Sequence, residues 1–259
     1  FARKNQAVAV TPFTLSGAMA PVTLPGAVSQ SIAEALAAIA LLQYINPGCP
    51  IILGTFTSNV DMKSGAPAFG TPEYIRATQI TGQMARHYNL PLRSSNACAA
   101  NAPDGQAMWE SLNSLWASST SGTNLVYHGD GWLEGGLIAS YEKFIMDCEV
   151  LQQFKRYFED ELCVVNEETL AFDAIAEVGP TGHFFGCQHT QDRYEKAFYS
   201  PFLSDWRNFE AWTEAGAEWT HQRANKIWKG ILTEFEAPPM DEGIKEELKD
   251  FVDRRIHEG

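Results

Sequence analysis

Features of several common protein classes are missing from this 259-residue sequence. Its five cysteines are odd in number and widely spaced, and no two form a Cys-x-x-Cys pair, which argues against a zinc ribbon, a thioredoxin-like motif and a disulfide scaffold. The longest apolar stretch, residues 32–45, contains Glu34 and Gln43, so we expect no membrane span, which needs about 18–20 apolar residues. No basic stripe is present to bind nucleic-acid phosphates. These absences predict a cytoplasmic protein without a nucleic-acid or membrane partner.

The acidic charge is concentrated in one half of the chain. Residues 1–140 hold 6 of the 19 Lys+Arg and 7 of the 32 Asp+Glu, and residues 141–259 hold all the others. The usual interpretation of such a charged, helical half is a set of solvated helix faces, and a partner-docking surface is the alternative. The chain begins with Phe1 rather than Met, which indicates a processed chain or a fragment.

Short apolar runs alternate with helical patterns along the first 160 residues. The apolar runs begin near residues 7, 50, 92 and 124, and helices are expected over about 27–45, 71–88, from 103 onwards, and 140–161. A fifth strand is expected at about 183–188, before helices at 192–199, 208–236 and 241–257. This alternation predicts βαβ units and a parallel sheet. Five strands fit part of a (β/α)₈ barrel or a doubly wound sheet, but the Gly-x-Gly-x-x-Gly fingerprint of the latter is absent from the strand ends.

In both architectures the C-terminal ends of the parallel strands carry the chemistry. Here those ends carry hydroxyls, amides and aromatic rings, with few charges and no Gly-x-Ser-x-Gly, His-Glu-x-x-His or Walker motif. The candidates at these positions include Phe13, Phe56, Asn96, His128, Trp132 and His189.

A series of ordered motifs carries a resemblance to a known family. The motifs are GAMAPVT at 17–23, NPGCP at 46–50, SGAP at 64–67, GTPE at 70–73, PDGQA at 103–107, GWLEGG at 131–136, EKF at 142–144 and GCQHT at 186–190. In them the sequence resembles the trimethylamine–corrinoid methyltransferases, and specifically the branch without pyrrolysine that includes glycine betaine methyltransferases. The resemblance implies an α/β fold of the TIM (β/α)₈-barrel family, of which this chain is the C-terminal half. Residues 1–200 would belong to the barrel, and residues 201–259 would form a C-terminal helical extension.

The resemblance also implies a reaction. A methyl group moves from a methylated or quaternary amine to the cobalt of a corrinoid (cobalamin), which a partner corrinoid protein carries and which this chain does not bind tightly. The full-length form is expected to be a homo-oligomer. In the trimethylamine enzymes pyrrolysine lies a few residues before the Pro-Asp pair, which corresponds here to about Ala97. Alanine cannot perform that chemistry, so a quaternary amine such as glycine betaine is the favoured methyl donor.

A quaternary ammonium has no hydrogen-bond donor and is held best by aromatic faces. The aromatic residues at or near strand ends are therefore candidates, with core packing as the alternative for each: Phe13, Phe56, Tyr127 and Trp132. A betaine carboxylate needs a cation or an amide donor, for which Arg93 and Asn96 are candidates. We therefore predict a substrate site formed by Phe13, Phe56, Asn96, Ala97, His128, Trp132 and His189.

The remaining polar candidates have weaker assignments. His128 is either a hydrogen-bonding group of the pocket or a structural histidine. Cys187 and His189 would share a face of an extended segment, but no matching pair occurs elsewhere, so we expect no metal site. Asp130 and Glu134 are not needed as bases, because methyl transfer from a quaternary amine moves no proton. Two alternatives stay open: another TIM-barrel or α/β enzyme acting on a small polar substrate, and a non-catalytic incomplete barrel.

Overall fold

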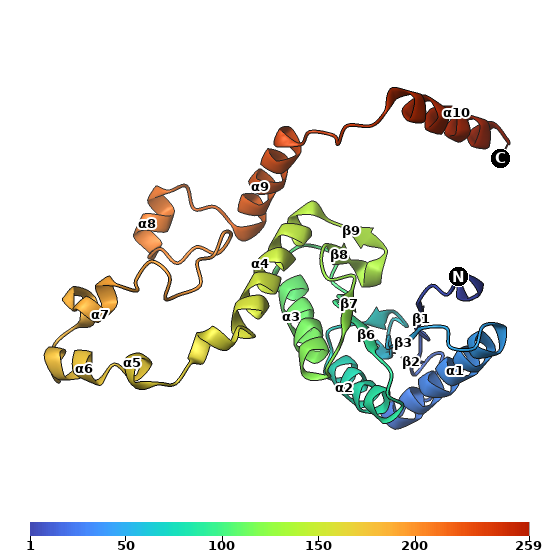
Figure 1. Ribbon diagram of the computed structural model, residues 1–259, viewed down its shortest axis with the longest axis horizontal. Coiled ribbons are helices and arrows are strands. Elements are labelled where there is room, and N and C mark those ends of the chain that lie inside the picture. The colour runs from blue at the N-terminus through green and yellow to red at the C-terminus, as the bar shows by residue number, and fades with distance from the viewer. Residues whose placement is uncertain (259) are drawn as a thin grey trace.

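The computed structural model describes residues 1–258, and a four-stranded parallel sheet in the order β1–β3–β6–β7 forms its centre (Figure 1). The strands are β1 (Val8–Val10), β3 (Ile51–Gly54), β6 (Leu92–Ser95) and β7 (Leu125–Tyr127). One long helix follows each strand in turn: α1 (Leu24–Ile45), α2 (Pro72–His87), α3 (Gly105–Thr120) and α4 (Tyr141–Tyr157). Successive parallel strands joined through helices are βαβ units. The predicted α/β fold of part of a (β/α)₈ barrel is therefore confirmed.

The sheet ends at β1 and β7, whereas a closed barrel has no edge. All three residues of β7 are exposed, with 40% of Leu125, 39% of Val126 and 56% of Tyr127 accessible. The inner strand β6, by contrast, is buried at all four positions. The open edge at β7 therefore presents apolar side chains and unpaired backbone groups to solvent.

The main core lies between the sheet and helices α1 and α2. It contains Val28, Ile32, Ala35, Leu53, Ala77, Ala85 and Leu92. Within residues 1–258, α1 is the one helix long and apolar enough to cross a membrane by length and composition, and 28% of its most apolar window is buried. The helix is longer than the apolar stretch 32–45 because it begins at Leu24, and the expectation of no membrane span stays a prediction. Core helices of ordinary domains satisfy the same criterion.

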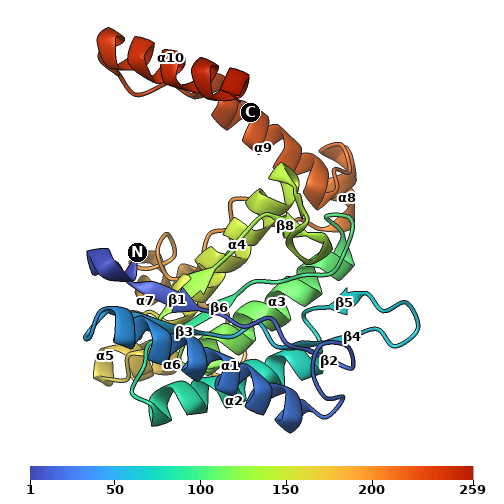
Figure 2. The same cartoon turned by 90° about the vertical axis from the view of Figure 1, so that its right-hand side faces the viewer.

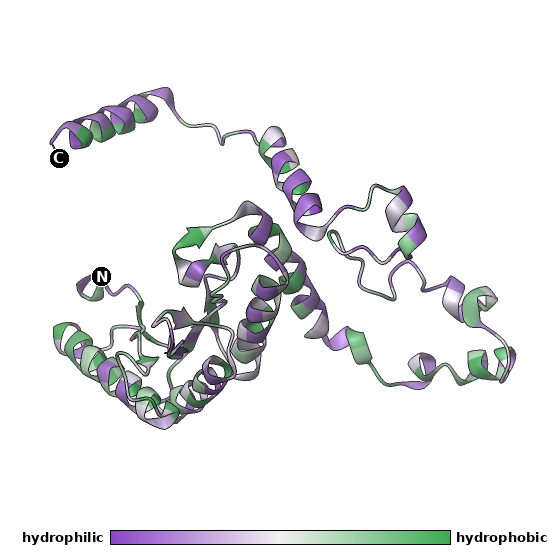
Figure 3. Cartoon of the chain, turned by 180° about the vertical axis from the view of Figure 1, so that it is seen from behind, coloured by the Kyte–Doolittle hydropathy of each residue, from purple (hydrophilic) through white to green (hydrophobic). Residues whose placement is uncertain are grey.

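Beyond α4 the chain leaves the sheet, as the yellow and orange segments of Figures 1 and 2 show. The short helices there are α5 (Glu167–Leu170), α6 (Phe172–Val178), α7 (Gln188–Gln191) and α8 (Phe209–Glu214). Helix α9 (Thr220–Glu234) returns to pack on α4, where Asn225 and Trp228 each donate a hydrogen bond to Glu142. Helix α10 (Glu242–Glu258) stands apart from the sheet. Figure 3 shows hydrophobic residues spread along the segment from α5 to α8 rather than gathered in one core.

Three expectations for this second half were wrong. The segment 183–188 is a 3₁₀ turn (Phe184–Gly186) leading into α7, because no strand lies beside it to pair with. Residues 192–199 form turns rather than a helix. The helix expected over 208–236 is broken into α8 and α9 around Gly216, whose φ of +104° lies outside helical geometry. The boundary at residue 200 stays a prediction.

Short strands absent from the predicted pattern form in the loops that follow the main strands. The strands β2 (Leu15–Ser16), β4 (Ser58–Val60) and β5 (Pro67–Ala68) make a three-stranded sheet. The strands β8 (Trp132–Leu133) and β9 (Ile138–Ala139) make a hairpin. Both lie in loops after the C-terminal ends of parallel strands, so they shape the region where the site was expected.

Candidate functional site

A cavity of about 140 Å³ lies at the C-terminal edge of the parallel sheet, after β3, β6 and β7. It is lined by Phe56, Ser95, Asn96, Ala97, His128, Trp132, Gly135 and Gly136. Five of the seven side chains predicted from the sequence thus meet at one place, because the ends of neighbouring parallel strands converge on one edge. The two predicted residues outside this lining are Phe13 and His189.

Arg93 does not line the cavity itself, but it contacts two residues that do, His128 and Phe56. It lies on β6 and only 6% of it is exposed. Its guanidinium carbon lies 5.8 Å from the centre of the Phe56 ring and 5.1 Å from that of Tyr127. Among the ion pairs formed by residues 1–258, none includes Arg93. A buried guanidinium without a carboxylate partner is unusual, because burying a charge costs free energy unless it is paired. The sequence made Arg93 a candidate for the betaine carboxylate, but the predicted substrate site did not include it.

His128 is the hydrogen-bond partner of this arginine. Nη2 of Arg93 lies 3.1 Å from Nδ1 of His128. Arginine can only donate, so Nδ1 must accept, and the neutral ring then carries its proton on Nε2. Burial lowers the pKa of His128 below its ordinary value of 6.5, and the charge of Arg93 lowers it further. The pair therefore places a guanidinium directly behind an imidazole that lines the cavity.

Aromatic rings form two sides of the same region. The rings of His128 and Trp132 are 5.4 Å apart and nearly perpendicular. Phe56 lies 5.2 Å from Phe69 and 5.2 Å from Phe13. Phe13 itself is 43% exposed, so it supports Phe56 from outside rather than lining the cavity.

The loop after β6 is held rigidly by α3. The Asn96 side chain donates to the carbonyl of Gly129 (2.9 Å), and the carbonyl of Ala97 accepts from Oγ of Ser114 (2.7 Å). Oε2 of Glu110 accepts from the two backbone N–H groups at positions 99 and 100. Asn96 and Ala97 therefore have fixed positions, in spite of lying in a loop.

His189 lies elsewhere, on α7, in a surface hollow that it shares with residues of α5 and α6. The neighbouring Cys187 side chain contacts the carbonyl of Phe184 and the hydroxyl of Thr190. Within residues 1–258, no group of three or more His, Cys, Asp or Glu side chains is close enough to hold a metal ion.

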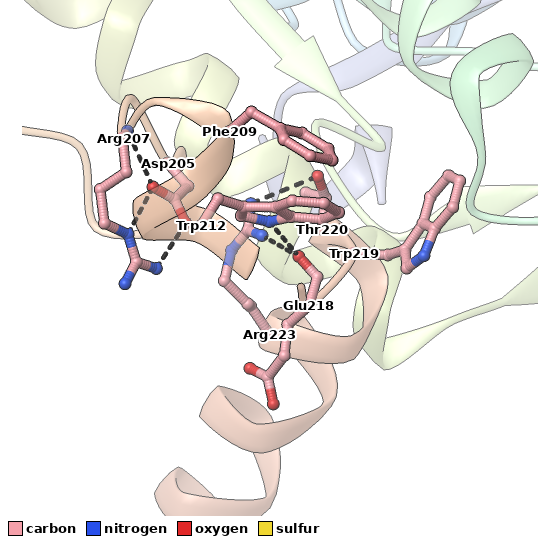
Figure 4. Close-up of a pocket in the computed structure, with 8 residues that line it drawn as sticks. All are labelled: Asp205, Arg207, Phe209, Trp212, Glu218, Trp219, Thr220 and Arg223. Carbon is pink, nitrogen blue, oxygen red and sulfur yellow. Dashed lines mark hydrogen bonds and ion pairs between the residues drawn. The ribbon is translucent and has the colours of Figure 1, made fainter. Parts of the chain in front are cut away.

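A larger hollow of about 390 Å³ lies between α8 and the start of α9, distant from the sheet (Figure 4). Its charged groups are paired internally: Arg207 bonds to both oxygens of Asp205, and Arg223 donates to the carbonyls of Glu218 and Leu203. Because both arginines already have partners in the protein, they fix the α8–α9 turn. The cavity at the sheet edge is the better candidate site, because the unpaired Arg93 contacts two of its lining residues, His128 and Phe56.

Known proteins agree with the ordered motifs. The family model described as Trimethylamine methyltransferase (MTTB) matches residues 1–259. The chain is 37% identical over 256 residues to the glycine betaine methyltransferase of Desulfitobacterium hafniense strain Y51, with 98% of this chain and 53% of that protein covered. It is 32% identical to the Trimethylamine methyltransferase MttB of D. hafniense strain DCB-2, covering 97% of this chain and 50% of that protein.

A third relative, the Trimethylamine methyltransferase MttB2 of Methanosarcina mazei, is 30% identical over 98% of this chain and 50% of its own length. The chain therefore spans about half the length of the curated relatives it matches. The match to the family model extends over the whole chain, and it confirms the resemblance carried by the ordered motifs. The chain belongs to the trimethylamine methyltransferase (MTTB) family.

Proposed function

We propose that the cavity at the sheet edge binds a quaternary amine that carries a carboxylate, of the glycine betaine type. The protein would transfer one methyl group of this amine to the cobalt of a corrinoid (cobalamin) held by a partner corrinoid protein. One observation carries the proposal: the buried Arg93 has His128 and aromatic rings as neighbours but no carboxylate partner within residues 1–258.

The carboxylate end of the substrate supplies the missing partner. A carboxylate accepts hydrogen bonds from a guanidinium in a planar, charge-assisted arrangement that an ammonium group cannot reproduce. The Nε2–H of His128 is a second donor beside it. Binding of such an anion would remove the cost of keeping Arg93 buried without a counter-charge.

The ammonium end requires the opposite environment. Its methyl groups cannot donate ordinary hydrogen bonds, and aromatic faces attract its charge. Trp132 and Phe56 line the cavity and are the rings available for this contact. A zwitterion with its two charges one carbon apart would thus meet a guanidinium at one end and aromatic rings at the other.

The methyl transfer itself needs no acid or base from the cavity. The C–N bond breaks with its electron pair remaining on nitrogen, so a neutral tertiary amine leaves. The electron pair of cobalt(I) forms the new bond to the methyl carbon, and no proton moves. The lining residues include no Asp or Glu, which suits a reaction in which the protein orients the substrate instead of exchanging protons.

The donor set of the cavity does not suit a resident metal. It contains one imidazole and neither a carboxylate nor a thiolate, whereas a stable metal site takes three or four protein ligands. The proposal therefore leaves the cobalt on the partner protein. A cytoplasmic location is part of the proposal, and the five cysteines, which are all free, suit it.

The test uses the natural polypeptide that carries this chain. It is incubated with cob(I)alamin and, in turn, with glycine betaine, tetramethylammonium and trimethylamine, and methylcobalamin is followed by its absorbance. We expect methylcobalamin with glycine betaine and little with the two amines that have no carboxylate. Absence of turnover with every quaternary amine would contradict the proposal, and so would equal turnover with tetramethylammonium.

A further inference from the structure

The motif at residues 142–144 contains a lysine that the proposed reaction does not use. Lys143 lies on α4 and is fully buried, as is Asp147 one turn further along the helix. Nζ of Lys143 lies 2.6 Å from Oδ1 and 2.5 Å from Oδ2 of Asp147, and 2.6 Å from Oγ of Ser111 on α3. This is the most deeply buried ion pair formed by residues 1–258.

The pair has one further partner, and it belongs to the site loop. Oδ2 of Asp147 accepts a hydrogen bond from the backbone N–H of Gly131 at 2.9 Å. Gly131 lies between His128 and Trp132, the two side chains that line the cavity from this loop. The backbone of this loop tolerates few substitutions, because φ is positive at both His128 (+56°) and Gly131 (+78°).

Other hydrogen bonds to the backbone also fix the loop that follows β7. The carbonyl of Gly131 accepts from the backbone N–H of Ser140, and the carbonyl of Gly129 accepts from the side chain of Asn96, both at 2.9 Å. The loop follows the edge strand β7, so no further strand of the parallel sheet supports it on that side. Its position therefore depends on these individual contacts, of which the one from Asp147 is charge-assisted.

Stability alone does not explain why a buried ion pair occupies positions 143 and 147. A buried ion pair often stabilises a fold no more than a well-packed apolar pair of the same volume. An apolar pair at 143 and 147, however, would leave the N–H of Gly131 without its acceptor. Burial raises the pKa of Asp147, and the charge of Lys143 and the hydrogen bond from Gly131 oppose that rise.

We infer that Asp147, kept in place by Lys143, is a positioning residue for the quaternary-amine site. By holding the backbone of Gly131 it sets where His128 and Trp132 stand relative to Arg93. The inference rests on the proposed function for its effect on substrate, while its effect on His128 is independent of any ligand.

Two double variants of the full natural polypeptide test this inference. Lys143→Met/Asp147→Asn removes both charges but keeps a side-chain oxygen for Gly131, whereas Lys143→Met/Asp147→Leu removes the oxygen as well. We expect the first variant to bind glycine betaine within about threefold of wild type and the second to bind it at least tenfold more weakly. Calorimetric titration gives the affinities, and thermal unfolding shows whether the two variants are equally folded.

The control is Glu149→Gln, another buried carboxylate of α4. Glu149 accepts from the backbone of Phe202 and Leu203 and does not contact the site loop. We expect it to lower the unfolding temperature without changing betaine affinity. A Leu variant that binds as well as the Asn variant overturns the inference, and so does an equal loss of affinity in both while both remain folded.

A ligand-free readout separates this inference from the proposed function. In the Leu variant the His128 ring should move away from Arg93, so its pKa, followed by NMR, should rise towards its ordinary value, while the Asn variant keeps the wild-type value. If wild type binds no quaternary amine, the proposed function fails and the His128 titration alone decides the inference. An unchanged His128 pKa in the Leu variant overturns it.

Discussion

Nη2 of Arg93 lies 3.1 Å from Nδ1 of His128, so a buried strand in the middle of the sheet is joined to the first residue beyond its edge strand. The contact fixes the histidine tautomer, because the guanidinium can only donate. It also places a permanent charge against a titratable ring that lines the cavity. Two properties of the protein should depend on this pair: its preference for a carboxylate and its stability at acid pH.

Replacing Arg93 by Gln should weaken the binding of glycine betaine by tenfold to hundredfold, since a hydrogen bond to a charged group contributes roughly 1.5–3 kcal/mol. Binding of tetramethylammonium, which has no carboxylate, should change by less than about threefold. Isothermal titration calorimetry with both ligands measures the two affinities. An equal loss for both would show that Arg93 supports the fold of the cavity rather than recognising an anion.

His128 should make the protein less stable as the pH falls below about 6.5. Its pKa in the folded state is lowered, so in the window between the folded value and the ordinary value of 6.5 the unfolded chain binds more protons. The stability supplied by the neutral ring is therefore complete above 6.5 and is lost as the pH falls through that window. The suitable control is His128→Asn, because Asn does not titrate and tolerates the φ of +56°.

Urea unfolding at pH 7.5 and pH 5 measures this effect. Wild type should lose more free energy of unfolding between the two pH values than the Asn variant does. The comparison between the two proteins removes the contribution of other groups, such as Asp147, whose raised pKa has the opposite influence. Equal losses in both proteins would show that the Arg93–His128 contact does not control His128.

The four main strands and their helices were predictable because their signals are local. The helix expected over about 71–88 begins at such a signal: Thr71 caps α2, and its Oγ1 accepts from the N–H of Tyr74 at 3.2 Å. Segment 183–188 failed because strand formation needs a neighbouring strand, and sequence alone does not show whether one is near. The break at Gly216 could have been suspected from the residue type, since glycine readily adopts positive φ.

Some features of the site were also predictable from the sequence and others were not. The lining residues at strand ends were predictable because parallel strands end at one common edge. The face of the sheet to which Arg93 points was not predictable. The strand β6 is buried at every position, and a strand buried on both faces shows no alternation of polar and apolar residues. The contact between Asp147 and Gly131 joins residues 16 positions apart across the β8–β9 hairpin, and no sequence pattern predicts it.

Trp132 should contribute to affinity through a cation–π contact with the ammonium group and not by filling space around the methyl groups. Trp132→Leu is expected to weaken glycine betaine binding by roughly 2- to 30-fold, the equivalent of a cation–π contact of about 0.5–2 kcal/mol, whereas Trp132→Phe should keep part of the affinity. The matched ligand is 3,3-dimethylbutanoate, in which carbon replaces the ammonium nitrogen. Calorimetry should show little change for this analogue, which keeps the carboxylate but lacks the positive charge, and a similar loss for both ligands would indicate that Trp132 only fills space.

The edge strand β7 should cause the 259-residue chain to associate with itself. Its apolar residues are exposed and its outer backbone groups have no partner strand within residues 1–258, which is the arrangement that favours edge-to-edge pairing. Placing a charge there by Val126→Lys should shift the chain towards monomer, because charged side chains disfavour pairing at a sheet edge. Size-exclusion chromatography with light scattering measures the mass of both proteins. A wild-type chain that elutes as a clean monomer would show that the open edge is covered in some other way.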